Sequence, residues 1–190
     1  MRVIAGQYRS RPLRSLRGMD IRPTSDRLRE TLFNVLCAGN PEALAGSTWL
    51  DLYAGTGAVG IEALSRGAGM VYFVEASKAA AELIAENLRS LGISAGFEIV
   101  KAEVGKAPGK LDALGAVADF VFVDPPYQMR EEYAKTLGAL AGSKLLREGS
   151  VVIAEHEKKF DPGEAFGGLL RFRKLEQGDA ALSFYRHNRS

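Results

Sequence analysis

The residues best suited to chemistry in this sequence are Asp124, Pro125, Pro126 and Tyr127, which directly follow the apolar run Phe-Val-Phe-Val at 120–123. Such a run is typical of a parallel strand that is buried on both faces, and ligands bind at the carboxyl ends of these strands. Consecutive prolines stiffen the chain and donate no N–H, so the Asp124 carboxylate and the Pro125 carbonyl can form a rigid pair of acceptors. That pair is suited to an –NH2 group.

The chemistry that this tetrapeptide predicts is methylation of an exocyclic amine on a nucleic-acid base. Hydrogen bonds to Asp124 and to the Pro125 carbonyl would draw the amine nitrogen toward a pyramidal geometry, with its lone pair aimed at a methyl donor. Positioning of this kind can supply about 7 to 11 kcal/mol, more than a single general base. Tyr127 offers a flat face on which an extruded base can stack, worth about 1 to 3 kcal/mol. We therefore predict catalytic roles for Asp124, Pro125 and Tyr127.

A glycine-rich loop predicts the binding site of a nucleotide-like cofactor. The pattern Gly55-x-Gly57-x-x-Gly60 stands between a predicted strand and a predicted helix. Glycine lets the backbone approach a ligand closely, and the start of a helix presents free N–H groups. NAD-binding proteins share this pattern and carry an acid where Glu75 stands. The loop alone therefore does not separate NAD from S-adenosylmethionine.

Two acids favour S-adenosylmethionine. Asp51, at the end of the strand before the loop, can reach the cationic amino group of a methionine moiety but would repel a pyrophosphate. Glu75, at the end of the next strand, can accept hydrogen bonds from both ribose hydroxyls. We predict S-adenosylmethionine as the cofactor, with S-adenosylhomocysteine as the product. The predicted contacts in this part of the chain are Asp51, Ala54, Gly55, Gly57, Glu75 and Asp124.

The elements that must position these residues alternate between apolar runs and helical stretches, which is typical of a parallel sheet with helices on both faces. Strands are expected at 49–52, 71–75, 98–100, 120–124, 151–155, 170–177 and 181–187, the last two forming a hairpin. Helices are expected at 28–36, after capping signals at 24–26, and at 59–66, 78–91, 110–114 and 131–140. This pattern predicts an α/β fold of the Rossmann-like class I methyltransferase type, with a seven-stranded, mostly parallel sheet.

The first thirty residues are strongly basic, with eight arginines and three acids in a chain whose net charge is only +2. Residues 2–5 and 11–16 are expected to form two strands around a polar turn, a hairpin outside the main core. A basic arm on a mildly acidic body is typical of a phosphate-binding attachment, and the alternative is an ordinary solvated strand. We predict an amino-terminal extension at 1–20 and a methyltransferase domain at 21–190.

The composition excludes several other kinds of protein. A single cysteine, Cys37, cannot form an internal disulfide, and with the scattered His156 and His187 it cannot make a metal cluster. No apolar run approaches the ~20 residues that cross a bilayer, and the charged start lacks the apolar core of a signal peptide. We expect no metal, no membrane partner and a cytoplasmic location.

Taken together, these motifs resemble the RsmD-type 16S ribosomal RNA guanine-N2 methyltransferases, from residue 2 to residue 187. The most specific stretch, RPTSDRLRETLFN at 22–34, is similar to the family's own segment before the cofactor domain. The resemblance implies that this segment lies against the methionine end of the cofactor, with Thr24, Arg27 and Glu30 as candidate contacts. The arginine-rich opening is similar to the family's RNA-facing hairpin, which implies RNA contacts by Arg9, Arg11, Arg14 and Arg22.

The resemblance also implies a substrate: one guanine of 16S ribosomal RNA, within the small subunit or an assembly intermediate, methylated at N2 by a monomeric enzyme. Three positions depart from the family. Ala5 and Ser10 stand where glycines are usual, and Lys101 stands where Asn or Asp is usual beside the adenine. We therefore expect the backbone at Ala102, or the Glu103 side chain, to make the adenine contact.

Three other functions remain open. An adenine-N6 methyltransferase would use the same chemistry, but we find no separate target-recognition domain in 190 residues, and a short basic hairpin suits RNA whose own fold presents the base. A binding module with a vestigial glycine loop would not need Asp51, Glu75 and Asp124 together. A small-molecule amine methyltransferase would not explain the arginine-rich arm.

Overall fold

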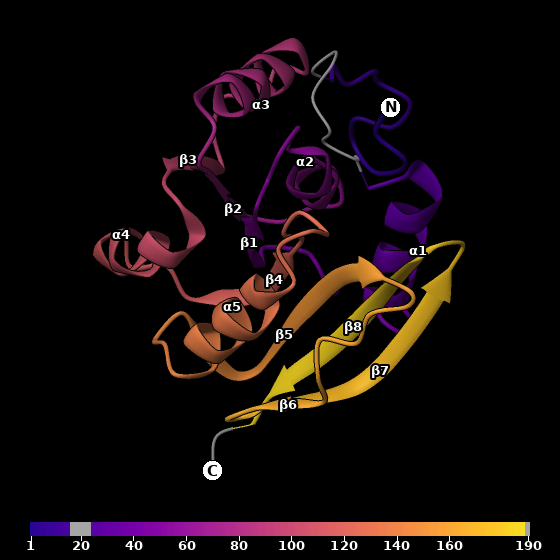
Figure 1. Cartoon of the computed structure of the whole chain (residues 1–190). Helices are drawn as coiled ribbons and strands as arrows, with labels where there is room; N and C mark the ends of the chain where they lie inside the picture. The colour runs from indigo at the N-terminus through magenta and orange to yellow at the C-terminus, as the bar shows by residue number, and fades with distance from the viewer. Residues whose placement is uncertain (16–23, 189–190) are drawn as a thin grey trace.

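The computed structural model describes residues 1–15 and 24–188, and in that part of the chain one eight-stranded sheet forms the middle layer (Figure 1). The strand order is β3-β2-β1-β4-β5-β8-β7-β6. The parallel strands are β1 (Thr48–Leu52), β2 (Met70–Glu75), β3 (Phe97–Lys101), β4 (Ala118–Val123) and β5 (Leu146–Glu157). The antiparallel strands are β6 (Ala165–Phe166), β7 (Leu169–Gln177) and β8 (Ala180–His187).

Helices cover both faces of this sheet (Figure 1). They are α1 (Asp26–Leu36), α2 (Ala58–Ser65), α3 (Lys78–Ser90), α4 (Ala107–Ala113) and α5 (Glu131–Ala141), with a 3-10 turn η1 (Val104–Lys106) before α4. Alternate residues of each central strand enter two separate cores. Trp49 and Phe73 pack with α1, α2 and α3, whereas Leu50 and Val74 pack with α4 and α5. The predicted α/β class, with a parallel sheet between helices, is confirmed.

The sheet contains one strand more than the seven predicted. The additional strand is β6, in which only Ala165 and Phe166 pair with β7. Two residues are too few to show an alternation in the sequence. The fifth strand also begins earlier than predicted, at Leu146, beyond a register shift between Ala118 and Phe120 of β4.

The N-terminal segment, residues 1–15, differs from the predicted two-stranded hairpin. Its two halves pair in antiparallel fashion at one isolated bridge, between Arg2 and Pro12, and the Val3 N–H donates to the Arg11 carbonyl at 3.0 Å, but no regular strand forms. The extended backbone is interrupted because Gly6 and Ser10 both have a positive φ. The segment does not lie outside the core either, since Val3 and Leu13 are buried with α1 and α2. The expected boundary at residue 20 lies outside the described residues.

The buried carboxylate of Glu62, on α2, holds this segment in place. Its oxygens accept hydrogen bonds from the backbone N–H groups of Ile4, at 2.8 Å, and Ala5, at 3.0 Å. Arg29 of α1, which is fully buried, lies 3.7 Å from the same carboxylate and donates to the Arg2 carbonyl at 2.8 Å. One acid therefore connects the N-terminal segment, α1 and α2.

We expect Glu62→Gln to lower the free energy of unfolding by about 3 kcal/mol or more, because Arg66 loses its carboxylate partner and the buried Arg29 keeps only that of Asp26. The matched control is Glu82→Gln on α3, whose ion pair with Lys78 is exposed and should contribute less than about 1 kcal/mol. Urea unfolding measures both changes. Equal losses in the two variants would contradict the role given to Glu62.

Candidate active site

Acidic residues stand at the carboxyl ends of neighbouring parallel strands. Val123 of β4 is in register with Ala154 of β5, so Asp124 and Glu155 are the next residues at the same level of the sheet. Glu75 ends β2 at that level, two strands from β4. Parallel pairing thus aligns three carboxyl-bearing residues along one edge.

Asp51, near the end of β1, is a fourth acid in this region. Its side chain is 2% exposed, and Oδ2 accepts a hydrogen bond from the Gly60 N–H at 2.9 Å. Burial raises the pKa of Asp51 to about 8, and the nearby charge of Glu75 adds to the rise, while the bond from Gly60 opposes it. A buried carboxylate with a raised pKa is stabilised in its charged form by a cation.

The loop between β1 and α2 is fixed by Glu75. The carboxylate accepts the Gly55 N–H on Oε2 and the Ser77 N–H on Oε1, both at 2.8 Å. Gly57 has φ +77°, and a Cβ at this position would lie 3.2 Å from the Ile84 side chain, so the loop requires glycine there. The structure therefore brings together the predicted cofactor contacts Asp51, Ala54, Gly55, Gly57 and Glu75.

These residues fit S-adenosylmethionine better than a dinucleotide. The start of α2 would be the natural place for a phosphate, but the Gly60 N–H is already bonded to the Asp51 carboxylate. A pyrophosphate would therefore meet an anion at this helix start. A ligand with an ammonium group and a ribose, and without phosphate, is compatible with Asp51 and Glu75.

The predicted adenine-side contact, Ala102, follows directly after β3. Its N–H donates to the Glu75 carbonyl at 3.2 Å, so this donor already serves the sheet. Lys101 is exposed, and its carbonyl accepts a hydrogen bond from Lys110 at 2.9 Å. A contact from Ala102 to the adenine stays a prediction.

Glu155 of β5, which is not among the predicted site residues, connects two residues that are. Its Oε2 accepts a hydrogen bond from the Thr24 hydroxyl at 2.6 Å, and its Oε1 accepts one from the Tyr127 hydroxyl at 3.5 Å. Tyr133 of α5 donates to the Glu155 carbonyl at 2.8 Å. Glu155 is 3% exposed. An acid in the apolar run VVIAEHE is the signal that could have indicated it.

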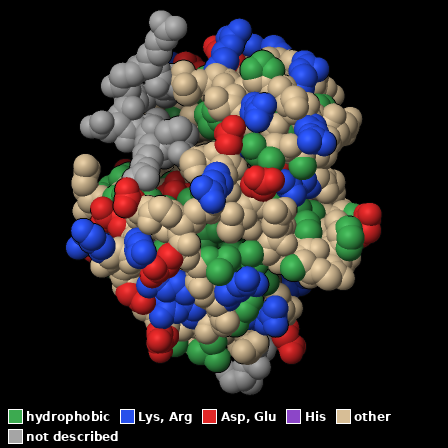
Figure 2. Space-filling view, turned by 90° about the vertical axis from the view of Figure 1, so that its right-hand side faces the viewer, with side chains coloured by type: hydrophobic (Ala, Val, Ile, Leu, Met, Phe, Trp, Pro, Cys, Tyr) green, Lys and Arg blue, Asp and Glu red, His purple; other side chains and the backbone are tan. Residues whose placement is uncertain are grey.

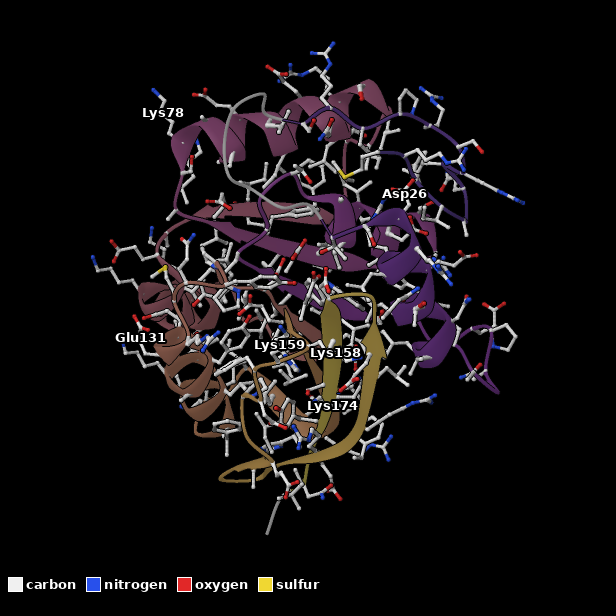
Figure 3. The ribbon with its side chains drawn as sticks, turned by 45° about the vertical axis from the view of Figure 1, so that its right-hand side comes forward. Asp26, Lys78, Glu131, Lys158, Lys159 and Lys174 are labelled. Carbon is white, nitrogen blue, oxygen red and sulfur yellow. The ribbon has the colours of Figure 1, made fainter. Side chains whose placement is uncertain are left out.

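A cavity of about 280 Å³ opens beside Glu155. Its walls are the start of α1 and the tip of the β7–β8 hairpin, which lies beside α1 in Figure 3. The lining residues are Ser25, Arg27, Leu28, Glu155, Gln177, Gly178, Asp179 and Ala180. Thr24 and Arg27 thus lie near Glu155, whereas Glu30 is exposed further along α1.

The predicted RNA contacts Arg11 and Arg14 lie against α3. Arg11 donates to the Ser90 carbonyl at 3.1 Å, and Arg14 pairs with Glu86 at 3.2 Å. Arg9 is exposed, and Arg22 lies outside the described residues. In Figure 2, Lys and Arg side chains dominate the top of the face, while acidic side chains are mixed with them lower down. Binding of RNA by these arginines stays a prediction.

Metal binding and membrane crossing each require a specific arrangement, with which the described residues can be compared. Within 1–15 and 24–188, no group of three or more His, Cys, Asp or Glu side chains is arranged to hold a metal ion. His156 is instead a buried core residue, hydrogen-bonded to Ser183 at 2.9 Å, and burial lowers its pKa. No helix in the same ranges combines the length and apolar character needed to cross a membrane.

We expect the affinity for S-adenosylmethionine to rise with pH up to about pH 8. Below its pKa of about 8, Asp51 holds a proton in the free protein. A bound ammonium group lowers that pKa, so binding releases a proton and becomes stronger as the pH rises. Calorimetry in two buffers of different ionisation enthalpy measures the release. Asp51→Asn should abolish the proton release, and the exposed control Asp112→Asn should keep it. Equal release in Asp51→Asn and the wild type would exclude Asp51 as the source of the proton.

Comparison with known proteins places this geometry in a family. A family model described as "Conserved hypothetical protein 95" matches residues 1–186. The chain is 34% identical to "Ribosomal RNA small subunit methyltransferase D" of Escherichia coli strain K12, over 83% of this chain and 75% of the relative. The Haemophilus influenzae protein of the same name is 36% identical, over 83% and 79%.

Solved structures agree on the fold. The Thermus thermophilus hypothetical protein TTHA0928 has a TM-score of 0.82 and 28% identity, covering 98% of this chain and 99% of its own. SMU.776, solved in complex with S-adenosylhomocysteine, has a TM-score of 0.66 at 16% identity over 84% of this chain and 48% of its own, a likeness of fold alone. The match over nearly the whole chain and the curated relatives above 30% identity confirm the predicted family, and the chain belongs to the RsmD family of ribosomal RNA methyltransferases.

Proposed function

We propose that this protein transfers a methyl group from S-adenosylmethionine to the exocyclic N2 amine of a guanine in 16S ribosomal RNA. The observation that carries the proposal is the position of Asp124 and Pro125 beside Glu155, on the same sheet edge as Asp51 and Glu75. The edge offers carboxylates for a cationic cofactor and acceptors for an amine. The names of the curated relatives support ribosomal RNA of the small subunit as the substrate.

When bound, S-adenosylmethionine supplies the electrophilic methyl group. The Asp51 carboxylate would pair with its ammonium group, and the Glu75 carboxylate would accept bonds from its ribose while keeping the Gly55 N–H. Thr24, Arg27 and Glu30 are the proposed contacts on the methionine side, with Ala102 on the adenine side. These residues bind and orient the donor.

The acceptor pair Asp124 and Pro125 then positions the amine. Asp124 is half-buried and Pro125 is buried at the end of β4, so two N–H bonds would hold the amine nitrogen with its lone pair toward the methyl group. Tyr127 would stack on the flipped base, with its hydroxyl held by Glu155. Burial raises the pKa of Tyr133, and the nearby carboxylates add to that rise, so Tyr133 remains a neutral donor to the Glu155 backbone.

The proposed substrate also suggests where the protein acts. A 16S ribosomal RNA target implies the cytoplasm, on the small subunit or on one of its assembly intermediates, and we propose a monomer. Arg9, Arg11, Arg14 and Arg22 are the proposed phosphate contacts. Adenine N6 would accept the same chemistry, and no contact among the described residues favours it.

We expect Asp124→Ala to lower methyl transfer roughly 10²- to 10³-fold or more, because the amine loses a preorganised acceptor. Transfer is measured with labelled S-adenosylmethionine on undermethylated small subunits and on their deproteinised RNA. Cofactor affinity, measured by calorimetry, should change little, and Asp112→Ala on α4 is the control for both readouts. An equal loss of transfer and cofactor binding would show that Asp124 is first a cofactor ligand.

Replacing Arg9 and Arg11 together with alanine should weaken RNA binding and reduce its dependence on salt. Each phosphate contact contributes roughly 0.7 to 0.9 to the slope of log K against log salt concentration, so two contacts should lower the slope by about 1.5. Filter binding over a salt series measures this slope. Lys135→Gln with Lys144→Gln, two exposed positions in and after α5, is the control. An unchanged slope would remove the N-terminal segment from the RNA interface.

A further inference from the structure

We propose that Glu155 is the residue that selects guanine, by accepting a hydrogen bond from the N1–H of the target base. The inference rests on the proposed function and adds what the tetrapeptide at 124–127 leaves open, since its acceptors suit the amine of guanine and of adenine equally. The group beside the amine is what differs between the two bases. Guanine carries a donor there, N1–H, and adenine carries an unprotonated N1, which is an acceptor.

The register of the sheet places Glu155 where this difference can be read. Asp124 and Glu155 follow the paired residues Val123 and Ala154, and adjacent strands lie about 4.8 Å apart. The amine and N1 are neighbours on one edge of the base. If Asp124 takes an amine N–H, Glu155 on the neighbouring strand β5 stands within reach of the N1 side of the base.

Contacts from two sides hold the Glu155 side chain in position. The bond from Thr24 to Oε2 is short, at 2.6 Å, and both residues are buried. The contact from Tyr127 to Oε1 is 3.5 Å, longer than the usual 2.5 to 3.0 Å of an O–H···O bond. A carboxylate oxygen accepts more than one hydrogen bond, so a substrate N–H can bind at Oε1 while Thr24 keeps the carboxylate oriented.

The cavity beside Glu155 has the properties that such a base requires. Its volume of about 280 Å³ is close to the smallest ligand sites, at about 300 Å³. Gln177, which also lines it, has a buried Oε1 without a hydrogen-bond partner among the described residues. Two acceptors therefore border the cavity, and the buried Gln177 oxygen is the one that needs a donor. Guanine brings three N–H donors on its Watson–Crick edge, whereas adenine brings two.

The test uses a target RNA that carries 2-aminopurine in place of the methylated guanine. This base keeps the exocyclic amine at C2 but lacks the hydrogen on N1 together with the O6 carbonyl, so the comparison of wild type and variant on both bases assigns the part that belongs to N1–H. For the wild-type protein we expect kcat/KM to be about 100-fold or more higher on guanine, because a site built for an N–H rejects analogues that lack it. The comparison uses reconstituted small subunits if naked RNA is not methylated.

Glu155→Gln should reduce that preference to about 10-fold or less, because an amide can either accept from N1–H or donate to a bare N1. If Glu155 had a purely structural role, Glu155→Gln would instead lower kcat/KM on both bases and leave the ratio of the two kcat/KM values unchanged. Glu157→Gln is the matched control, since Glu157 lies two residues further along β5 and pairs with Arg130 at 3.0 Å. Its ratio should equal that of the wild type.

The outcomes separate the inference from the proposed function. Equal wild-type activity on guanine and 2-aminopurine would overturn the role of Glu155 while leaving guanine methylation intact, and so would a Glu155→Gln variant with an unchanged ratio. Absence of wild-type methylation on guanine substrates would overturn both. Equal wild-type activity on the two bases needs no substitution, so that result overturns the inference even if the variant is unstable.

Discussion

The arrangement of the site depends on the register of the parallel strands, which brings several carboxylates to one edge of the sheet. Carboxylates that lie close together repel one another. Asp51 shows this repulsion, since burial and the charge of Glu75 raise its pKa to about 8. Backbone N–H groups of Gly55 and Gly60 compensate part of this charge. The negative charge that these bonds leave uncompensated favours a cationic cofactor at β1 and β2 and a donor-rich base at β4 and β5.

Helix α1 contacts both the N-terminal segment and the sheet edge that carries the acidic residues. Arg29 fixes α1 to Glu62, the acid that also holds the backbone of residues 4 and 5. Just before the same helix, Thr24 reaches Glu155. The proposed RNA-facing segment and the proposed base pocket therefore share one rigid support. A change that loosens α1 should affect both, which is why tests of either surface require a matched control for stability.

Local patterns in the sequence predict the fold and those site residues that belong to a short motif. Alternating apolar runs identify the parallel strands, and the glycine spacing and the Asp124 tetrapeptide identify the ends of β1 and β4. The missing contacts are long-range: Thr24 and Glu155 are 131 positions apart, and Glu62 is 58 positions from Ile4. A sequence reveals an acid within an apolar run but does not reveal its partner. The two halves of the N-terminal segment do pair, but only through one bridge and a few backbone bonds. The predicted strands are not regular because part of this backbone bonds to Glu62 and Ser65 of α2.

The most direct test of the account is the identity of the nucleoside that the protein makes. Undermethylated small subunits are incubated with the protein and labelled S-adenosylmethionine, and the ribosomal RNA is digested to nucleosides and separated with mass detection. The account predicts N2-methylguanosine at a single position of the 16S RNA, absent with Asp124→Ala. N6-methyladenosine as the labelled product, or label outside the RNA, would contradict it.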